Sequence, residues 1–389
     1  MDAREVIRRC RVLAEFSEEP GFTTRTFLSP PMRQVHRLVS EWMEAAGMSV
    51  TLDAAGNLRG VSGMGRRPLM IGSHLDTVPH AGAFDGILGV IMGIALVEGR
   101  PNQPIEIAAF SEEEGVRFGI PFIGSRAVAG NPVMNAPVLE AIRAYGLNPE
   151  ELPQAELADC IQGYLEFHIE QGPVLERLAI PLGVVEAIVG LTRLQAVFRG
   201  RANHAGTTPM ELRHDALAAA AEWAIAVERE AMRTAGLVAT VGRMEIEPNA
   251  ANVIAGISRA SLDVRHADDG VRCGAVETLR AAANRIAERR GLTVEFVPQL
   301  EQPAVAMDRV MAAMLEHAAA AAGYGVHRMP SGAGHDAMIL ASKVPAAMLF
   351  VRSPGGISHH PDEAVLEEDV AAALEVGVRF LDEWGKQHD

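Results

Sequence analysis

PLMIGSHLDT (residues 68–77) is the segment that decides the fold class: an apolar run that ends in His74 and Asp76. Three further segments share this design, namely IEIAAFSEEEG (105–115), YLEFHIEQG (164–172) and AMLFVRSPGGISHH (347–360). Helical patterns alternate with them, near 3–16, 31–47, 308–322 and 363–384. Such alternation predicts the α/β class, with an open mixed sheet flanked by helices. Because ligands bind beyond the carboxyl ends of strands in such sheets, one crevice could collect the polar residues that follow all four runs.

From about residue 191 the pattern changes to strand, helix, strand, strand, helix, strand. The strands are predicted in LTRLQAVFRG (191–200), VATVGRMEIE (238–247), GISRASLDVRH (256–266) and LTVEFVP (292–298), and the helices at about 211–234 and 271–290. This order is typical of a ferredoxin-like α+β unit. We therefore expect a discontinuous catalytic domain at residues 1–187 and 303–389 and an inserted domain at 188–302.

Length and charge limit the classes of function. A chain of 389 residues exceeds what one hydrophobic core normally organises, which favours two domains. Its 50 acidic and 35 basic side chains give a net charge of -15, which disfavours nucleic acid and anionic membranes as partners. The three cysteines (Cys10, Cys160 and Cys273) form no C-x-x-C pair, so neither a disulfide framework nor a thiolate zinc site is expected. No apolar run reaches about 18 residues. We expect a cytoplasmic protein.

Histidines and carboxylates at the strand ends predict a metal site. Imidazole nitrogen and carboxylate oxygen are the ligands that Zn, Mn and Co bind at sites with open positions. Asp85 lies in a glycine-flanked turn, AGAFDGILGV (81–90), before an apolar helical pattern. The three acids Glu112–Glu114 follow a buried strand, where their mutual repulsion is costly unless a cation offsets it. Two divalent ions, with a shared carboxylate, are the natural count. Asp76 is placed to fix the tautomer of the His74 imidazole.

The histidines and acidic residues at the strand ends also have simpler interpretations. A single histidine at a strand end is more often an ordinary polar residue, and an acidic triplet is usually a solvated loop. The coincidence of four strand ends favours the metal site. SGAGHDA (331–337) formally matches G-x-G-x-x-A, but no acidic ribose partner follows it, so a dinucleotide site is not expected. His335 and Asp336 either support the site or cap a turn. Phosphate-binding loops and the G-x-S-x-G elbow of serine hydrolases are absent from the sequence.

The motifs together resemble the hydantoinase/carbamoylase-type amidases, a branch of the binuclear-metal aminoacylase and carboxypeptidase superfamily. The matching stretches, spread over nearly the whole chain, are GSHLDTV (72–78), GAFDGILGV (82–90), SEEEGVRF (111–118), HIEQGP (168–173), ANHAGTTPM (202–210), PNAANVIAG (248–256), LDVRH (262–266) and GISHHPDE (356–363). The resemblance implies an amidohydrolase that cleaves the carbamoyl (ureido) C–N bond of N-carbamoyl-L-amino acids and releases amino acid, ammonia and carbon dioxide. The alternatives are an allantoate amidohydrolase, a beta-ureidopropionase or, in another class, a catalytically silent metal-dependent binding protein.

The resemblance also implies metal ligands. One divalent ion would be held by His74, Asp85 and His168, and the other by Asp85, Glu114 and His359, with Asp85 as the bridge. Glu113 would be the general base, which leaves Glu112 without a role. His360 is ambiguous with His359.

The inserted domain resembles the lid and dimerisation domain of these enzymes. His204 would stabilise the oxyanion, from the partner subunit of a homodimer, and the alternative for it is an exposed turn histidine. Asn252 and Arg265 would bind the carboxylate of a small ureido or amide substrate, since an arginine fork donates two charge-assisted hydrogen bonds. A surface salt bridge is the alternative for Arg265. Gln171 and Gly356 would be further substrate contacts.

Overall fold

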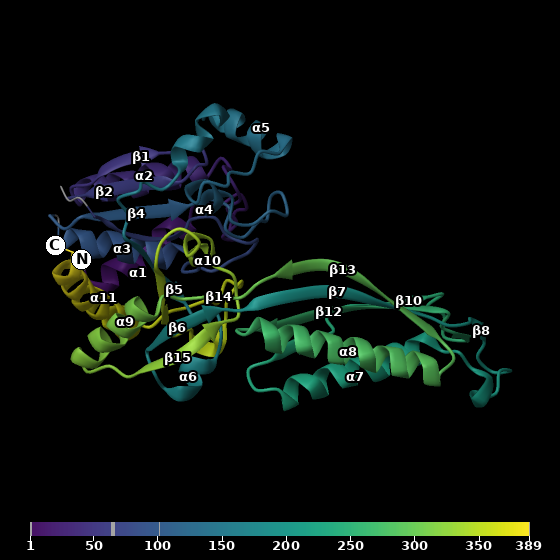
Figure 1. The fold of residues 1–389 in the computed structure, drawn as a ribbon. Helices are drawn as coiled ribbons and strands as arrows, with labels where there is room; N and C mark the ends of the chain where they lie inside the picture. Colours follow the sequence, from purple (N-terminus) through teal and green to yellow (C-terminus); the bar gives the residue numbers. More distant parts are fainter. Residues whose placement is uncertain (1, 64–66, 101, 389) are drawn as a thin grey trace. The chain divides into compact units, whose positions relative to one another are not determined.

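The computed structural model describes residues 2–63, 67–100 and 102–388. It consists of two compact units, unit 1 with residues 1–186 and 307–389 and unit 2 with residues 187–306 (Figure 1). The boundaries predicted from the sequence were 187/188 and 302/303. Within the described ranges, every helix is too short or too polar to cross a membrane.

The larger sheet positions the polar strand ends. Among the described residues it has nine strands in the order β1-β2-β4-β3-β5-β16-β6-β14, with β15 beside β6. Four neighbouring strands, β4, β3, β5 and β16, run parallel, and the flanking pairs are antiparallel. The strands are β1 (Ser49–Leu52), β2 (Leu58–Ser62), β3 (Leu69–His74), β4 (Ile105–Phe110), β5 (Gly163–Ile169), β6 (Leu182–Ile188), β14 (Val305–Ala306), β15 (Val326–Ser331) and β16 (Ala346–Val351). The sheet is therefore mixed, as predicted.

Helices cover both faces of this sheet. Successive residues of a strand point to opposite faces, and Phe167 of β5 packs beside Gly377 while Glu166 accepts a 2.9 Å hydrogen bond from the Ala337 amide. Gly377 belongs to α11 and Ala337 to α10, so the predicted flanked sheet is confirmed. The helices of unit 1 are α1 (Ala3–Ala14), α2 (Met32–Ala45), α3 (Ile87–Glu98), α4 (Ile123–Val128), α5 (Ala136–Tyr145), α6 (Val174–Leu178), α9 (Arg309–Ala321), α10 (Asp336–Leu340) and α11 (Glu367–His388), with 3₁₀ turns at Pro149–Ala155 and Pro354–Gly356.

Helix α3 is buried along residues 87–97, because its sequence is apolar all round. It packs against β3, β4, β5, α1 and α11. Gly86 precedes it with φ of 69°, a conformation that L side chains rarely adopt. The buried helix therefore anchors the turn that carries Asp85, because this turn leads directly into it.

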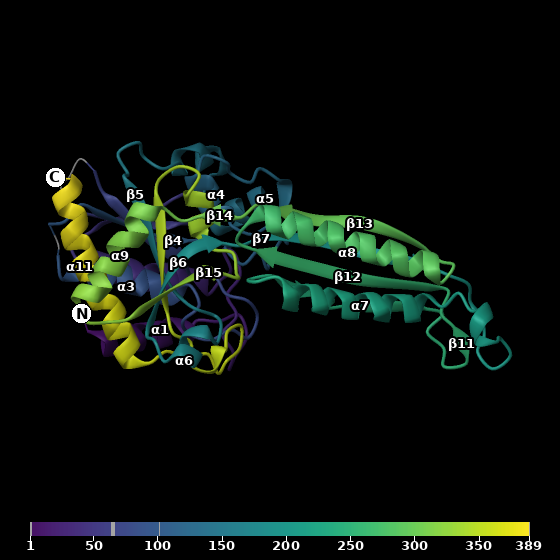
Figure 2. The same cartoon turned by 60° about the horizontal axis from the view of Figure 1, so that its bottom comes forward.

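Unit 2 is the predicted ferredoxin-like α+β unit. Among its residues, all of them described, β10-β12-β7-β13 form an antiparallel sheet with β9 beside β12. Its two helices pack on each other and on this sheet around Trp223 and Phe198, and Figure 2 shows them beside the strands. The elements are β7 (Gly190–Arg199), α7 (Ala216–Arg233), β9 (Val238–Thr240), β10 (Met244–Glu247), β12 (Ile257–His266), α8 (Asp269–Arg289) and β13 (Thr293–Gln302), with a two-stranded pair, β8 (Asn203–His204) and β11 (Val253–Ile254), and a 3₁₀ turn at Met210–Leu212.

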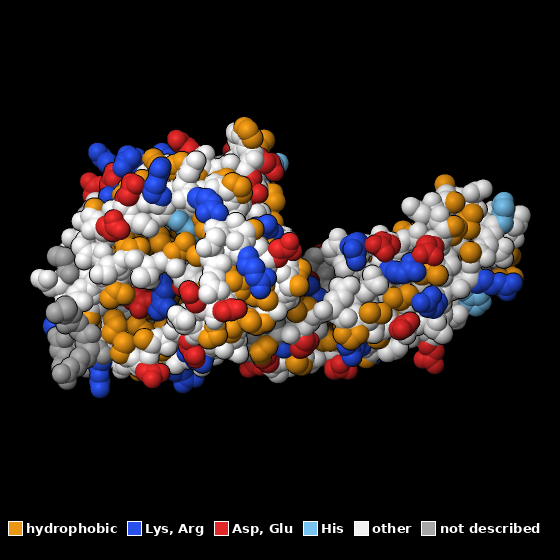
Figure 3. Space-filling model, turned by 90° about the horizontal axis from the view of Figure 1, so that it is seen from above, with side chains coloured by type: hydrophobic (Ala, Val, Ile, Leu, Met, Phe, Trp, Pro, Cys, Tyr) orange, Lys and Arg blue, Asp and Glu red, His pale blue; other side chains and the backbone are white. Residues whose placement is uncertain are grey.

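Two predicted elements of unit 2 differ in detail. The strand predicted at residues 238–247 is two strands, β9 and β10, separated by the segment around Gly242. The helix expected from about residue 211 begins at Ala216, because the Asp215 side chain accepts a hydrogen bond from the Ala218 amide and caps it. On the face drawn in Figure 3, the acidic and basic side chains of this unit are interspersed.

Candidate metal centre

The predicted ligands lie at one edge of the larger sheet. His74 ends β3, the three glutamates follow β4, His168 is the penultimate residue of β5, and His359 lies in the loop after β16. These four strands are parallel neighbours, so their carboxyl ends meet at the same edge. Asp85 reaches this edge from the turn before α3.

Asp85 is at the centre of the cluster. Its Oδ1 lies 3.3 Å from His168 Nε2 and 3.8 Å from His74 Nε2, and its Oδ2 lies 3.2 Å from His359 Nε2. Glu114 Oε1 is 3.5 Å from the same nitrogen of His359. Two groups of potential ligands result, each with its atoms within 4.8 Å of one another, and they share Asp85. Ligands about 2.1 Å from a tetrahedral ion are about 3.4 Å apart, which matches these separations.

The donor atoms fit a cation. Among the described residues, Asp85 Oδ1 and His168 Nε2 are buried and have no hydrogen-bond partner, which is rare for buried polar atoms. A cation between them would satisfy both. A Cβ on Gly86 would lie 2.5 Å from the His74 ring, so only glycine at this position leaves room for that imidazole.

Both buried imidazoles are held in one tautomer. His74 Nδ1 lies 3.0 Å from the Asp76 carbonyl oxygen and His168 Nδ1 lies 2.9 Å from the Ile169 carbonyl oxygen. A carbonyl oxygen only accepts, so each Nδ1 carries the hydrogen and each Nε2 presents its lone pair toward Asp85. This is the form that binds a metal.

Asp76 acts differently from the prediction. Its carboxylate lies 3.7 Å from His74 Nδ1 and instead accepts hydrogen bonds from the Glu113 amide, at 3.1 Å, and the Glu114 amide, at 3.2 Å. The backbone carbonyl of Asp76, rather than its side chain, fixes the His74 tautomer. The side chain orients the acidic turn, a task that residue spacing alone did not reveal.

The carboxylates of the cluster repel one another. Burial, and next the charge of Glu114, raises the pKa of Glu113 well above its ordinary value; burial and the charge of Asp85 do the same for Glu114. Burial also raises the pKa of Asp76. Burial opposes ionisation of Asp85, but the hydrogen bond to His359 and the charge of His168 lower its pKa below the ordinary value. A divalent cation would offset the repulsion among these acids.

His359 has the least protected position in the cluster. Its side chain is 49% exposed and its φ is 55°. The hydrogen bond to Asp85 raises the pKa of His359 to about 9. The neighbouring His360 is exposed, and its Nδ1 accepts a hydrogen bond from the Asp362 amide. Of the two histidines, only His359 thus belongs to a potential ligand group with Asp85 among the described residues.

Glu112 supports the loop rather than the cluster. Its carboxylate accepts hydrogen bonds from the Phe27 amide, at 2.9 Å, and the Arg117 amide, at 2.7 Å. Burial, and next the charge of Asp76, raises the pKa of Glu112 to about 7. Its φ of 52° turns the chain so that its side chain and those of the next two glutamates face different surroundings.

Gln171 and Gly356 lie in loops at the same edge. Gln171 Nε2 donates to Asp85 Oδ2, at 3.1 Å, and to the Ser358 hydroxyl, at 3.2 Å. Its side chain is thus engaged with the cluster itself. Gly356 has φ of 63°, and a Cβ there would lie 2.8 Å from the Pro173 nitrogen. The glycine allows two loops to approach closely.

His335 and Asp336 are buried beneath the cluster. The His335 ring lies 4.4 Å from the His168 ring, and its Nε2 lies 2.8 Å from the Ser331 hydroxyl. Burial lowers the pKa of His335 well below its ordinary value. Asp336 begins α10, where Ser125 faces its carboxylate. Glu166 lies in the same region, close enough to His168 and His335 to form a further potential ligand group, and it was not predicted from the sequence.

Of the predicted residues of unit 2, Arg265 lies near the end of strand β12, whereas His204 and Asn252 lie in the segments beyond its start. His204 of β8 is exposed and faces Val253 of β11, next to Asn252. Arg265 lies in β12 opposite Leu191, whereas the start of this strand, Ile257, lies opposite Arg199. Arg265 follows Ile257 by eight positions, which span about 26 Å at about 3.3 Å per residue.

Within one chain, therefore, Asn252 and Arg265 are too far apart to bind the same carboxylate. The prediction that both bind it did not state which subunit supplies each residue. Arg265 forms the salt bridge that was the alternative for it, with the partly exposed Asp263. It donates to both oxygens of Asp263, at 2.8 and 3.1 Å, and Asp263 accepts a third hydrogen bond, of 2.7 Å, from Arg193.

Comparison with known proteins identifies the family. Residues 70–383 match the model of peptidase family M20/M25/M40, which covers most of the chain. The chain belongs to this family. It is 38% identical to the N-carbamoyl-L-amino acid amidohydrolase of Geobacillus stearothermophilus over 390 residues, which cover 95% of each chain. It is 36% identical to allantoate deiminase 1 of Glycine max, over 97% of this chain and 89% of that one.

Solved structures of the family agree with this placement. A hydantoinase/carbamoylase family amidase from Burkholderia ambifaria superposes with a TM-score of 0.90 and 34% identity, over 98% of this chain and 97% of that one. The predicted membership of the hydantoinase/carbamoylase branch is thus confirmed. So is the enzyme class: the protein is an amidohydrolase that acts on C–N bonds.

Proposed function

We propose that the protein hydrolyses the carbamoyl C–N bond of N-carbamoyl-L-amino acids. The observation that carries the proposal is the pair of ligand groups that share Asp85, with Glu113 beside them. The likeness to a named N-carbamoyl-L-amino acid amidohydrolase supports the choice of substrate. Allantoate, another small ureido compound, is the second candidate, because allantoate deiminases from plants are similar over nearly the whole chain.

Two divalent ions, of Zn, Mn or Co, would occupy the cluster. His74, Asp85 and His168 would hold one, and Asp85, Glu114 and His359 the other. When bound, such ions polarise a carbonyl oxygen and lower the pKa of water toward neutrality. The paired donors, the orphaned oxygen of Asp85 and the repelling acids support this assignment.

Glu113 would be the general base. Its Oε2 lies 4.0 Å from His74 Nε2, so its carboxylate is beside the proposed ligands. It would accept a proton from the attacking water and pass it to the nitrogen that leaves when the C–N bond breaks. The Asp76 carboxylate, which holds the Glu113 amide, would keep this base in place. The products would be the amino acid, ammonia and carbon dioxide.

Arg265 would bind the substrate carboxylate, and Asp263 would hold its guanidinium in a fixed plane. His204 and Asn252, at the far end of the strand, would come from a second copy of the chain, as stabiliser of the oxyanion and as a substrate contact. A homodimer through unit 2, acting as a lid, would meet this need. Gln171 and Gly356 would shape the rim of the site.

The substrate proposal is tested by ammonia release from protein loaded with two ions per chain. The panel is N-carbamoyl-L-amino acids, allantoate, 3-ureidopropionate and simple amides. We expect the highest kcat/KM for an N-carbamoyl-L-amino acid. A higher value for allantoate would favour the second candidate, and no turnover of any compound by fully loaded protein would support a silent binding protein.

The dimer proposal has a separate test. Protein with His204→Ala and protein with Glu113→Gln should each be inactive, because each lacks one part of every site. Mixed dimers would contain one site with both parts intact, so activity should return to a fraction of the parent value on mixing. Mixtures that remain inactive although subunits exchange, checked by two affinity tags, would refute sharing between chains.

A further inference from the structure

Two loops of unit 1 bring their ligands to the cluster without support from a strand. Asp85 lies in the turn before α3, and His359 lies in the loop between β16 and α11. The proposed second ion depends on both of these residues, together with Glu114. Because His359 is half exposed, packing alone holds it poorly. Contacts between the two loops therefore set their separation, and one of them runs through Gln171, whose Nε2 donates to Asp85 Oδ2 and to the Ser358 hydroxyl.

Glu363 provides a second contact between these loops, and it is buried. Its Oε1 accepts hydrogen bonds from the Phe84 amide, at 2.9 Å, and the Asp85 amide, at 3.0 Å. Its Oε2 accepts a 3.1 Å hydrogen bond from the hydroxyl of Ser358, the residue before His359. The residue is 5% exposed, and each of its carboxylate oxygens accepts a hydrogen bond from one of the two loops. One buried carboxylate thus joins the backbone that carries Asp85 to the loop that carries His359.

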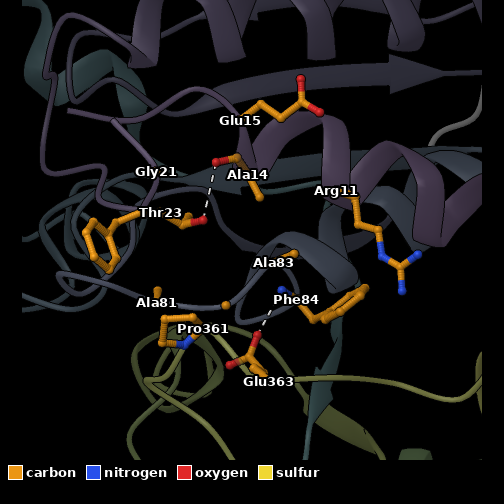
Figure 4. Close-up of a pocket in the computed structure, with 12 residues that line it drawn as sticks. Arg11, Ala14, Glu15, Gly21, Thr23, Ala81, Ala83, Phe84, Pro361 and Glu363 are labelled. Carbon is orange, nitrogen blue, oxygen red and sulfur yellow. Dashed lines mark hydrogen bonds between the residues drawn. The ribbon is translucent and has the colours of Figure 1, made fainter. Parts of the chain in front are cut away.

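The backbone makes room for this residue. A Cβ on Gly82 would lie 2.3 Å from the Glu363 Cβ and 2.5 Å from its Oε1, so only glycine at position 82 lets the carboxylate reach the two amides. On its other side Glu363 borders a cavity of about 590 Å³, shown in Figure 4, where it lies below Phe84 and beside Pro361. Glu15 and Arg11 of the α1 region line the same cavity.

We propose that Glu363 is a positioning residue that sets the distance between the Asp85 and His359 loops and thereby the affinity for the second ion. The inference rests on the proposed function, since it assumes that the cluster binds two ions. Glu363 would touch neither the ions nor the substrate. Residues that orient metal ligands typically change metal affinity by about 10-fold to 100-fold when they are replaced.

The test is a calorimetric titration of the full chain with Zn²⁺ or Co²⁺, which needs no turnover. Glu363→Ala should bind the second ion about 10-fold to 100-fold more weakly. The first ion shares only Asp85 with the second, so its affinity should fall much less. The electron paramagnetic resonance spectrum gives a second readout, with two equivalents of Co²⁺ added per chain. The parent should show magnetic coupling between its two Co²⁺ ions, and Glu363→Ala should have lost this coupling. Glu363→Gln keeps an acceptor for the two amides and should restore most of the affinity.

Two further variants separate positioning from general damage. Glu15→Ala removes a carboxylate from the same cavity wall, and within the described residues Glu15 makes no side-chain hydrogen bond to either loop, so both ions should bind as in the parent. Gly82→Ala should reproduce the effect of Glu363→Ala by displacing an intact carboxylate. Circular dichroism should show unchanged folding of the variants.

The outcomes distinguish this inference from the proposed function. If the parent binds two ions and Glu363→Ala and Gly82→Ala bind both with the parent affinities, the positioning role is refuted while the proposed function stands. Equal weakening of both ions in the folded variants would refute it as well, because the effect would not be specific to His359. A parent that binds fewer than two ions would overturn both.

Discussion

Three consecutive glutamates after β4 divide between two environments. Glu112 accepts hydrogen bonds from neighbouring backbone amides, whereas Glu113 and Glu114 belong to the potential ligand groups. The left-handed φ of Glu112 and the Asp76 carboxylate, which holds the next two amides, produce this division. Identical residue types thus receive their roles from backbone geometry, which a residue pattern does not contain.

Glu113→Gln should remove turnover while metal binding remains. Glutamine cannot accept the proton of the attacking water, so kcat should fall by about 100-fold to 10 000-fold. Metal content, measured by plasma mass spectrometry after dialysis, should stay at the parent level. If the variant lost one ion instead, the roles of Glu113 and Glu114 would have to be exchanged.

Protonation of the unfolded chain at His36 should lower the free energy of unfolding of the protein in mild acid. His36 is buried, its Nδ1 lies 3.0 Å from the Tyr145 hydroxyl, and burial lowers its pKa to about 4. Because the unfolded chain has the ordinary value near 6.5, the unfolded state binds more protons below that pH, and stability falls as the pH drops from about 6.5 to 4.

From pH 7 to pH 5 this group should cost about 2 kcal/mol of the free energy of unfolding. Other groups titrate in the same range, so the measurement is a difference. Denaturant unfolding of the parent and of His36→Gln, both with chelator, should show the smaller pH dependence for the variant. Parallel pH profiles for the two proteins would contradict the assignment.

At the level of elements, the sequence predicted the features that depend on local patterns. The four parallel strands and the apolar α3 were expected, because each is a buried run with polar residues at its end. The hairpin of β1 and β2 was not, since both strands are short and only partly buried. β6 was missed too: it pairs with β16, far away in the sequence, and nothing in its own residues specifies that partner.

In the candidate site, too, local patterns predicted some residues and missed those that act through distant contacts. His74, Asp85, Glu114, His168 and His359 could be selected because strand ends and motifs identify them. Glu363 and the backbone role of Asp76 could not, because they act through hydrogen bonds between loops that no residue spacing encodes. Similarly, the distance between Asn252 and Arg265 depends on strand register.

The turn before α3 gives a prediction for the element as a whole. Gly86→Ala should impair metal binding as well as stability, because the added Cβ would meet the His74 ring at 2.5 Å. Gly119→Ala is the matched control: Gly119 also has positive φ, of 67°, but a Cβ added there would have no atom within 4 Å.

The control should lose about 1–2 kcal/mol of stability from backbone strain alone and keep its affinity for metal. Denaturant unfolding and calorimetric titration measure the two effects separately. Equal metal affinities for Gly86→Ala and the parent would contradict this prediction, because they would show that the His74 imidazole can keep its position beside an alanine.

At the scale of the whole molecule, the two units have separate hydrophobic cores, one around α3 and the parallel strands and one around Trp223 and Phe198. A core of its own is what allows a segment to fold independently. Residues 187–306 expressed alone should therefore unfold cooperatively, as followed by circular dichroism, and give dispersed amide resonances. A chain that stays unfolded would show that unit 2 needs unit 1 to be stable.

Unit 2 also enters and leaves the rest of the chain through neighbouring strands. Ile188 of β6 faces Val305 of β14, in an antiparallel pair whose Cα atoms are about 5 Å apart. A two-residue hairpin turn spans such a gap. The whole module could be exchanged for a short loop, or for the corresponding module of another amidase, while the five proposed ligands stay on the retained scaffold. Substrate choice and metal chemistry could then be engineered separately in one polypeptide.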